Sequence, residues 1–454
     1  MSLASTGETT QPMCPSNKGP TLPQELVDAT VDCLFHDRDA LQQCSLVCKA
    51  WEPRITLHLF SSFSYPRCRH LYHPHHLLPQ LNAAGADCDI CHSTSTTFPA
   101  CLSFLASARP GIRKAIRSLK LSGLRRRGTP DTSVPFGGVG MPSPLFNEGL
   151  SCAVLSDMLG LLPCLDSVEF RDLLRAEPTT IPIVHNVFTI KEVRIDFAYF
   201  PDDLSKILSL FAHINKLEIR RVTMTDEAHR DHTPRRGRTR VDHLVFGGRD
   251  LSGAIVAIVS DLRALIPFGL LQSLVLERSD IAVWDTALRE AQSLQSLDYY
   301  VRGSLPALHP DASLHSLALS AFVPIFLIFL PSEWPGAMHH LRHATALYRH
   351  TLRRVRLRII MLDKLIESEH DMENYDPLVV LRKGLSEQGW SSFNEILLGM
   401  PMLDQIFVQL KRQPMQNAAF VTEDARNIEA VVTEISLMSL DKRFAPILRV
   451  SVEM

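Results

Sequence analysis

The segment Leu271-Gln272-Ser273-Leu274-Val275-Leu276 carries the pattern on which the fold of this 454-residue chain depends, apolar-x-x-apolar-x-apolar. Apolar and polar residues alternate at its end, which is typical of a β-strand with one buried face. We identify ten copies: Ile116-Leu119-Leu121, Leu165-Val168-Phe170, Ile190-Val193-Ile195, Ile214-Leu217-Ile219, Val241-Leu244-Phe246, Leu271-Leu274-Leu276, Leu294-Leu297-Tyr299, Leu314-Leu317-Leu319, Leu352-Val355-Leu357 and Leu403-Ile406-Val408.

The copies recur at similar intervals. From Leu165 to Leu314 their starting positions step by 25, 24, 27, 30, 23 and 20 residues, as subtraction of adjacent positions gives. This spacing resembles that of leucine-rich repeats, whose period is about 20 to 29 residues. Helical periodicity precedes several copies, at 154–162, 204–211 and 393–398. We therefore expect an α/β fold, an irregular leucine-rich-repeat solenoid with parallel strands lined by helices. A mixed α/β domain whose buried strands share the pattern is the alternative.

Residues that alternate with the buried ones should point from the concave side of this sheet into solvent. Charges of both signs occupy these positions, which suits a protein or peptide ligand better than a phosphate backbone. As exposed charges, each should contribute only about 0 to 1 kcal/mol to stability. The predicted target-binding residues are Glu169, Arg171, Glu192, Arg194, Asp196, Lys216, Glu218 and Arg220, and the same alternation exposes Asp298, Tyr300, Arg354, Arg356 and Arg358. Ordinary solvated surface is the alternative at each position.

The N-terminal segment 21–65 has helical periodicity. Thr21 and Gln24 have the spacing of a capping box, which predicts a helix that starts with Thr21 as its N-cap. A second short helix near Asp39 would place one apolar stripe on Leu41, Cys44, Cys48 and Trp51. Three short helices cannot enclose all the large apolar side chains of the segment, so some of them should face another protein.

The motif Leu22-Pro23-x-Glu25-Leu26, followed by Leu46-Val47-Cys48-Lys49-x-Trp51, resembles an F-box and is similar to the large fungal F-box family. The resemblance covers residues 22–62. It implies a three-helix module that docks a Skp-type adaptor and, through it, a cullin–RING ubiquitin ligase. The motif positions implicated in that contact are Leu22, Pro23, Leu26, Leu46, Val47, Cys48 and Trp51. An ordinary three-helix hairpin is the alternative.

The resemblance also implies a function for the whole chain. The F-box would dock the adaptor while the solenoid captures an unknown target protein for ubiquitination, as the substrate-recognition subunit of a Skp–cullin–F-box ligase. An F-box scaffold that does not direct ubiquitin transfer is the main alternative. No G-x-S-x-G elbow or Walker phosphate loop occurs, so we expect no enzymatic activity in this chain.

A Cys/His-rich insertion is predicted at 66–99. Cys88-x-x-Cys91-His92 lies downstream of Cys68 and several histidines, and these residue types could form a tetrahedral zinc site. The same five residues match a c-type haem attachment motif. We predict a polar loop that holds neither metal nor cofactor, with a zinc-binding or redox protein as the weaker alternative.

Composition and charge limit the possible partners and the cellular compartment. Lys and Arg number 47 against 49 Asp and Glu, so no chain-wide field favours nucleic acid or an anionic membrane. The ten cysteines are too few for a disulfide scaffold, and residues 1–20 read as a disordered leader, so we expect a cytoplasmic or nuclear protein. The predicted organisation is a leader at 1–20, an F-box at 21–65, the insertion at 66–99 and the solenoid at 100–454. Two further loops are predicted at 123–149 and 226–240.

Overall fold

The computed structural model of the chain describes residues 23–47, 49–65, 98–122, 152–173, 188–198, 207–220, 239–247, 252–277, 281–301, 305–322, 333–362, 382, 389–413 and 425–453. Within these ranges, twelve strands form one sheet in which every neighbouring pair is parallel and the strand order is the order of the chain. The predicted α/β class with parallel strands is therefore confirmed.

The elements are listed here in chain order. The strands are β1 (Ser62–Tyr65), β2 (Ser118–Ser122), β3 (Ser167–Leu173), β4 (Phe188–Ala198), β5 (Phe211–Arg220), β6 (Arg240–Gly247), β7 (Ser273–Glu277), β8 (Ser296–Tyr300), β9 (Ser316–Phe322), β10 (Arg354–Leu362), β11 (Gln405–Gln413) and β12 (Leu448–Glu453). The α-helices are α1 (Gln24–Cys33), α2 (Arg38–Val47), α3 (Glu52–Phe60), α5 (Phe98–Ser107), α6 (Pro110–Ala115), α7 (Cys152–Gly160), α9 (Ser252–Leu265), α10 (Asp285–Glu290), α11 (Trp334–Tyr348), α13 (Trp390–Leu398) and α14 (Ala425–Ser439), and the 3₁₀-helices are η4 (Phe268–Leu270), η5 (Ile281–Trp284) and η7 (Lys442–Phe444).

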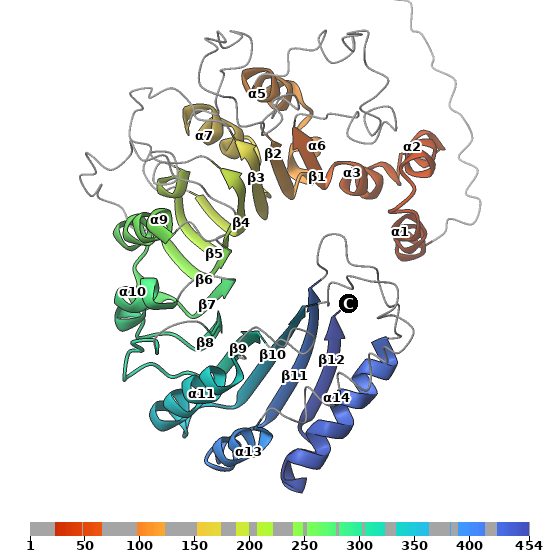
Figure 1. Ribbon diagram of the computed structural model, residues 1–454. Helices are drawn as coiled ribbons and strands as arrows, with labels where there is room; N and C mark the ends of the chain where they lie inside the picture. The colour runs from red at the N-terminus through yellow and green to blue at the C-terminus, as the bar shows by residue number, and fades with distance from the viewer. Residues whose placement is uncertain are drawn as a thin grey trace, which may run out of the picture.

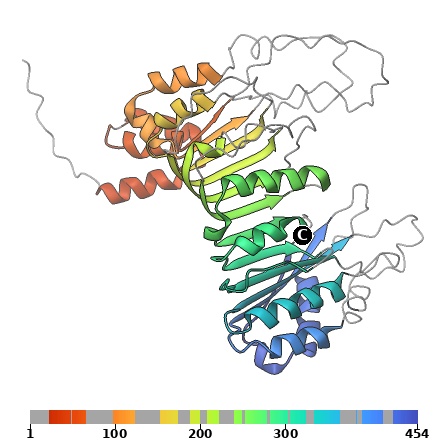
Figure 2. The ribbon, with the colours of Figure 1, turned by 90° about the vertical axis from the view of Figure 1, so that its left-hand side faces the viewer.

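The sheet and the helices form two curved layers. Figure 1 shows the strands along the inner side of an arc and helices such as α7, α9, α11 and α13 along its outer side. The short helices α1, α2 and α3 lie at one end of the arc, and α14 with β12 lies at the other. In the side view, the strands stack one after another from the N-terminal to the C-terminal end (Figure 2). The arrangement is solenoid-like, and its two faces differ in chemistry.

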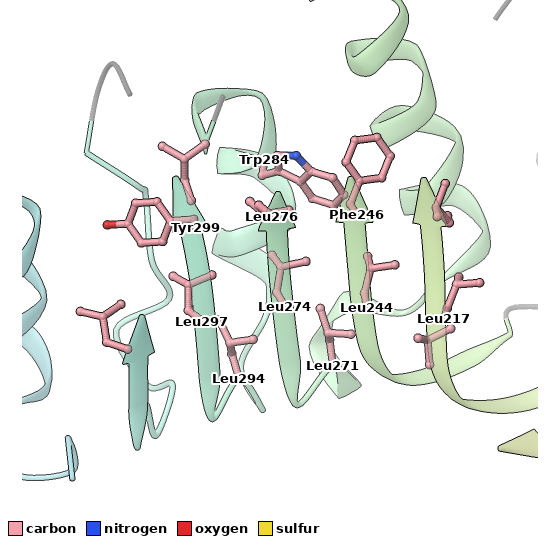
Figure 3. Close-up of a cluster of buried hydrophobic side chains, with 14 of the residues drawn as sticks. Leu217, Leu244, Phe246, Leu271, Leu274, Leu276, Trp284, Leu294, Leu297 and Tyr299 are labelled. Atoms are coloured by element: carbon pink, nitrogen blue, oxygen red, sulfur yellow. The ribbon is translucent and has the colours of Figure 1, made fainter. Parts of the chain in front are cut away.

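The register of the sheet aligns the copies of the sequence pattern. Leu217, Leu244, Leu274 and Leu297 are direct partners on β5, β6, β7 and β8, and they lie in a row in Figure 3. The complete row, formed by the second apolar residue of each copy and its partners on the end strands, is Phe63, Leu119, Val168, Val193, Leu217, Leu244, Leu274, Leu297, Leu317, Val355, Ile406 and Leu448. Ten of these twelve side chains are fully or almost fully buried, and those of the end strands are more accessible. Burial of each contributes about 1.5 to 3 kcal/mol.

The helices bury one stripe each against this sheet. On α14 the buried positions are Ile428, Val431, Val432 and Ile435, which recur at the three- and four-residue spacing of one helical face. In the middle of the sheet, the indole of Trp284 fills the layer between strand and helix (Figure 3). Its ring meets those of Phe246 and Phe268 edge to face, with centroid distances of 5.2 and 6.3 Å. The core is thus continuous from unit to unit.

The sheet has two more strands than the ten copies predict. β1 belongs to the segment 21–65, and Phe63 and Tyr65 on it pair with Leu119 and Leu121. β12 follows the last copy and pairs with β11. Residues 62–65 are therefore part of the sheet. The domain boundary predicted at residue 65 falls between β1 and β2, which pair with each other. The predicted leader, almost all of the insertion 66–99, the loop 123–149 and nearly all of the loop 226–240 lie outside the described residues.

The N-terminal helices have a small core of their own. Val31, Leu41 and Ile55 are almost fully buried in it, and the Trp51 side chain packs against them. The capping-box prediction is wrong, because α1 begins at Gln24 with Pro23 as N-cap, and the Gln24 side chain donates a hydrogen bond to Asp28. The helices are linked to one another by polar contacts as well as by this core.

Candidate functional site

The eight predicted target-binding residues come together on three neighbouring strands, at positions that alternate with the buried row. Glu169, Arg194 and Glu218 are register partners across β3, β4 and β5. A second row contains Arg171, Asp196 and Arg220, and Glu192 pairs with Lys216. These residues lie on the inner face of the sheet because the residues between them point into the helix-covered core.

The signs of these charges alternate along the strands and across them. The Lys216 ammonium lies 2.8 Å from the Glu192 carboxylate and 3.4 Å from that of Glu218. Arg220 approaches Glu218 to 2.6 Å on one side and Glu277 of β7 to 3.1 Å on the other. We call this set, with Lys120, the charge lattice; its members are Lys120, Glu169, Arg171, Glu192, Arg194, Asp196, Lys216, Glu218, Arg220 and Glu277.

Two members of the lattice are buried, contrary to the sequence-based expectation, and so is Tyr300 at the end of β8. Only 4 % of the Glu218 side chain and 9 % of the Glu169 side chain is accessible. Arg194, Lys216 and Arg220 surround the first carboxylate, and Lys120 and Arg171 cover the second. Cations from the same strand and from the neighbouring strand reach over the acidic side chains, which removes those carboxylates from solvent. The expectation that these two residues are exposed is therefore wrong, and the estimate for exposed charges does not apply to them.

The lattice holds Lys216 in its charged form. The hydrogen bond to Glu192 raises the pKa of the Lys216 ammonium, and the charge of Glu218 adds to the effect. A lysine with a raised pKa is protonated and so is a poor base or nucleophile. The ion pairs hold the side chains of the inner face in place, and the lattice contains five cations and five anions.

The C-terminal part of the same face has a different composition. Arg358 on β10 is fixed by three neighbours: it donates to Gln409 at 3.1 Å and to Ser320 at 3.0 Å, and lies 3.5 Å from Asp298. Burial raises the pKa of the Asp298 carboxyl, and the nearby charges of Arg358 and Arg356 oppose this rise. Arg356 lies over the ring of Phe407, 5.1 Å from its centroid.

The predicted adaptor-binding residues differ in how far the structure describes them. Leu22, Cys48 and the side chain of Val47 lie outside the described residues. Pro23 is exposed, Leu26 on α1 is 55 % accessible, and Leu46 on α2 is 87 % accessible. Trp51 is partly buried against the small helical core. Sequence reasoning missed Phe35, which follows α1 and is 54 % accessible. Its ring lies beside that of His36 and 6.4 Å from that of His58 on α3, and nothing in the sequence pattern marked it as exposed.

The described ranges also bear on metal binding and on membrane crossing. No group of three or more His, Cys, Asp or Glu side chains suited to a metal ion occurs in the part of the chain that the structure describes, and Cys68, Cys88, Cys91 and His92 lie outside it. Among the described helices, none has both the length and the apolar character needed to cross a membrane.

Comparison with known proteins adds no relative. No protein-family model matches the chain, and no curated protein matches it in sequence.

Proposed function

We propose that the chain is the substrate-recognition subunit of a Skp–cullin–F-box ubiquitin ligase. The N-terminal helices would dock a Skp-type adaptor, and the inner face of the leucine-rich-repeat solenoid would hold a target protein. The observation that carries the proposal is the exposure of large apolar side chains on helices whose own core is small.

That exposure has an energetic meaning. A leucine with 87 % of its surface accessible, as for Leu46, gains nothing from folding of the chain itself. The same side chain in a desolvated pocket of a partner contributes to association, and a few such anchors usually dominate the binding energy of an interface. Leu26 and Leu46 are both positions of the F-box motif, so the exposed residues and the motif agree.

The proposed mechanism is proximity. A target on the inner face would be held near a ubiquitin-charged conjugating enzyme elsewhere in the ligase, so that its lysines meet the reactive thioester at high effective concentration. The covalent chemistry would belong to the other subunits. This division of labour leaves recognition of the adaptor and of the target to the present chain.

The test compares two pairs of substitutions in exposed apolar residues. Leu26→Ala with Leu46→Ala should weaken binding of a purified Skp-type adaptor by roughly 2 to 4 kcal/mol, the range of interface hot spots. The control is Leu437→Ala with Met438→Ala on α14, where the side chains are 46 % and 79 % accessible. Equal, saturable binding by the wild type and the first variant would refute the adaptor contact.

A second measurement separates ligase from scaffold. A cullin should be recovered together with the adaptor when the full chain is purified from cells, and its amount should fall in the Leu26→Ala, Leu46→Ala variant. Recovery of adaptor without cullin would instead favour an F-box scaffold that does not direct ubiquitin transfer.

A further inference from the structure

The inner face of the sheet carries its charge unevenly. At the alternating positions of β2 to β7, the five cations of the charge lattice match its five anions, so the net charge is zero. At the same positions of β8 to β12 there are five cations and two anions, a net charge of +3: Arg354, Arg356, Arg358, Lys411 and Arg449 against Asp298 and Glu453.

The cations of the C-terminal half fall into two groups. Arg358 is fixed by Asp298, and the Lys411 ammonium lies 2.9 Å from Glu453. Arg354 and Arg356 are exposed, and within the described ranges no carboxylate forms an ion pair with either of them. Arg449 donates only to backbone carbonyl groups, of Pro446 and Leu448.

The neighbouring strands explain why these arginines have no acidic register partner among the described residues. The register partners of Arg354 and Arg356 on β9 are Ser316 and Ala318, whose side chains are short and uncharged. On the other side, Phe407 lies between Arg356 and Arg449 in one row across β10, β11 and β12. In the charge lattice, by contrast, the corresponding partner of each arginine is a carboxylate. We call Arg354, Arg356, Phe407 and Arg449 the basic strip.

We infer that the basic strip binds an extended acidic segment of the target protein. Arg354, Arg356 and Arg358 follow one another at every second residue of β10, so their spacing is about 6.6 Å per step. Alternate side chains of an extended peptide have the same spacing, so carboxylates at every second position could meet Arg354 and Arg356 while the peptide runs along the strand. The half-buried ring of Phe407 offers an apolar contact beside them.

A protein segment fits this strip better than a nucleic acid. A phosphate backbone carries charge at regular steps and is best held by a surface of one sign. Here two carboxylates, Asp298 and Glu453, lie on the same half of the inner face, and the charge lattice beyond them has no net charge. A short acidic segment needs only the strip itself. The inference rests on the proposed function, because it names the chemistry of the target that the inner face would hold.

The test uses the full chain and a fluorescein-labelled peptide in which glutamate alternates with serine over nine residues. Fluorescence anisotropy should show saturable binding that weakens as salt is added, because exposed charges are screened. Arg354→Glu with Arg356→Glu should weaken binding by at least about tenfold, which corresponds to about 1.4 kcal/mol. The matched control, Arg289→Glu with Arg342→Glu on the outer helices α10 and α11, changes the net charge equally and should retain binding.

Three results would overturn the inference. One is equal binding of a peptide with glutamine in place of glutamate, and another is equal loss of binding in the control variant. The third is a single-stranded oligonucleotide that binds at least tenfold more tightly and displaces the peptide, which would make the strip a nucleic-acid surface. Adaptor capture by the wild-type chain is measured in parallel, so failure of the wild-type chain to bind the peptide while it binds the adaptor normally refutes the inference alone. Normal peptide binding without adaptor binding refutes the proposed function alone.

Discussion

Arg194 on β4 and Glu218 on β5 are direct register partners, and their guanidinium and carboxylate groups lie 3.3 Å apart on the inner face of the sheet. Both residues occupy the same position of the repeated pattern, one copy apart. The pairing shows that the chain matches charge between copies as well as apolar side chains. Neighbouring units are therefore joined on both faces of the sheet, by packing on the outer side and by ion pairs on the inner side.

Removing the charge of Glu218 should destabilise the protein. Glu218→Gln leaves Arg194, Lys216 and Arg220 close together without their common anion. We expect the free energy of unfolding in urea to fall by about 1 to 2 kcal/mol, the lower part of the range for hydrogen bonds to charged groups, since the three cations are partly solvated. The control is Glu453→Gln. Glu453 pairs with Lys411, both side chains are accessible, and this substitution should change the free energy of unfolding by less than about 0.5 kcal/mol. Equal effects of the two substitutions would contradict the structural role of the lattice.

The row formed by the second apolar residue of each copy should be the most sensitive part of the core. Leu274→Ala removes a fully buried side chain between two register partners, and we expect a loss of about 2 to 5 kcal/mol in the free energy of unfolding. Leu270→Ala, four residues earlier and 48 % accessible, should cost less than about 1 kcal/mol. Chemical denaturation followed by circular dichroism measures both. A tolerated Leu274→Ala would mean that the row is not packed as described.

Asp32 should titrate at low pH. Hydrogen bonds from Arg54, and next from His58, lower the pKa of its carboxyl from 3.8 to about 2. Because the folded pKa lies below the unfolded value, the contact stabilises the N-terminal helices above pH 3.8, and this contribution is lost as the pH falls through about 2. Carbon NMR of labelled aspartate should show the pKa rising towards 3.8 in Arg54→Ala and unchanged in Arg289→Ala. An unchanged pKa in Arg54→Ala would show that the contact is absent in solution.

The Cys/His-rich segment provides a prediction from sequence alone. Cys88 and Cys91 lie outside the described residues, and we expect them to hold no metal. Protein purified without added zinc should contain well under one equivalent by elemental analysis, and Cys88→Ser with Cys91→Ser should keep the wild-type melting temperature. One zinc per chain, lost in the double variant together with several kcal/mol of stability, would establish a structural metal site.

The sequence was sufficient to predict a parallel sheet and ten of the twelve described strands. The apolar pattern has the period of a strand, and its strict order of apolar positions leaves only one alignment that buries every copy. β1 was missed because its segment also matched the end of an F-box motif. β12 was missed because the position that corresponds to the first apolar residue of its copy is Ala445, a small and exposed residue.

The location of the candidate site was predictable from the sequence, but the burial of its carboxylates was not. Alternation correctly placed Glu169 and Glu218 on the face opposite the core, but it cannot tell whether neighbouring cations will cover a carboxylate. That depends on the register between strands, which brings Lys120, Glu169, Arg194 and Glu218 into one row of alternating sign. In the same way, the register partner of Arg354 on β9 is the uncharged Ser316, a neighbour 38 positions earlier in the chain.

The agreement between strand order and chain order has a consequence for biosynthesis. Each strand pairs with the strand made just before it, so no unit waits for a distant part of the chain before it can join the sheet. A nascent chain can therefore extend the sheet in the order of translation, with every new strand added to an edge that is already formed. Ribosome-arrested chains of increasing length should gain protease resistance one unit at a time, each keeping the register of the finished protein.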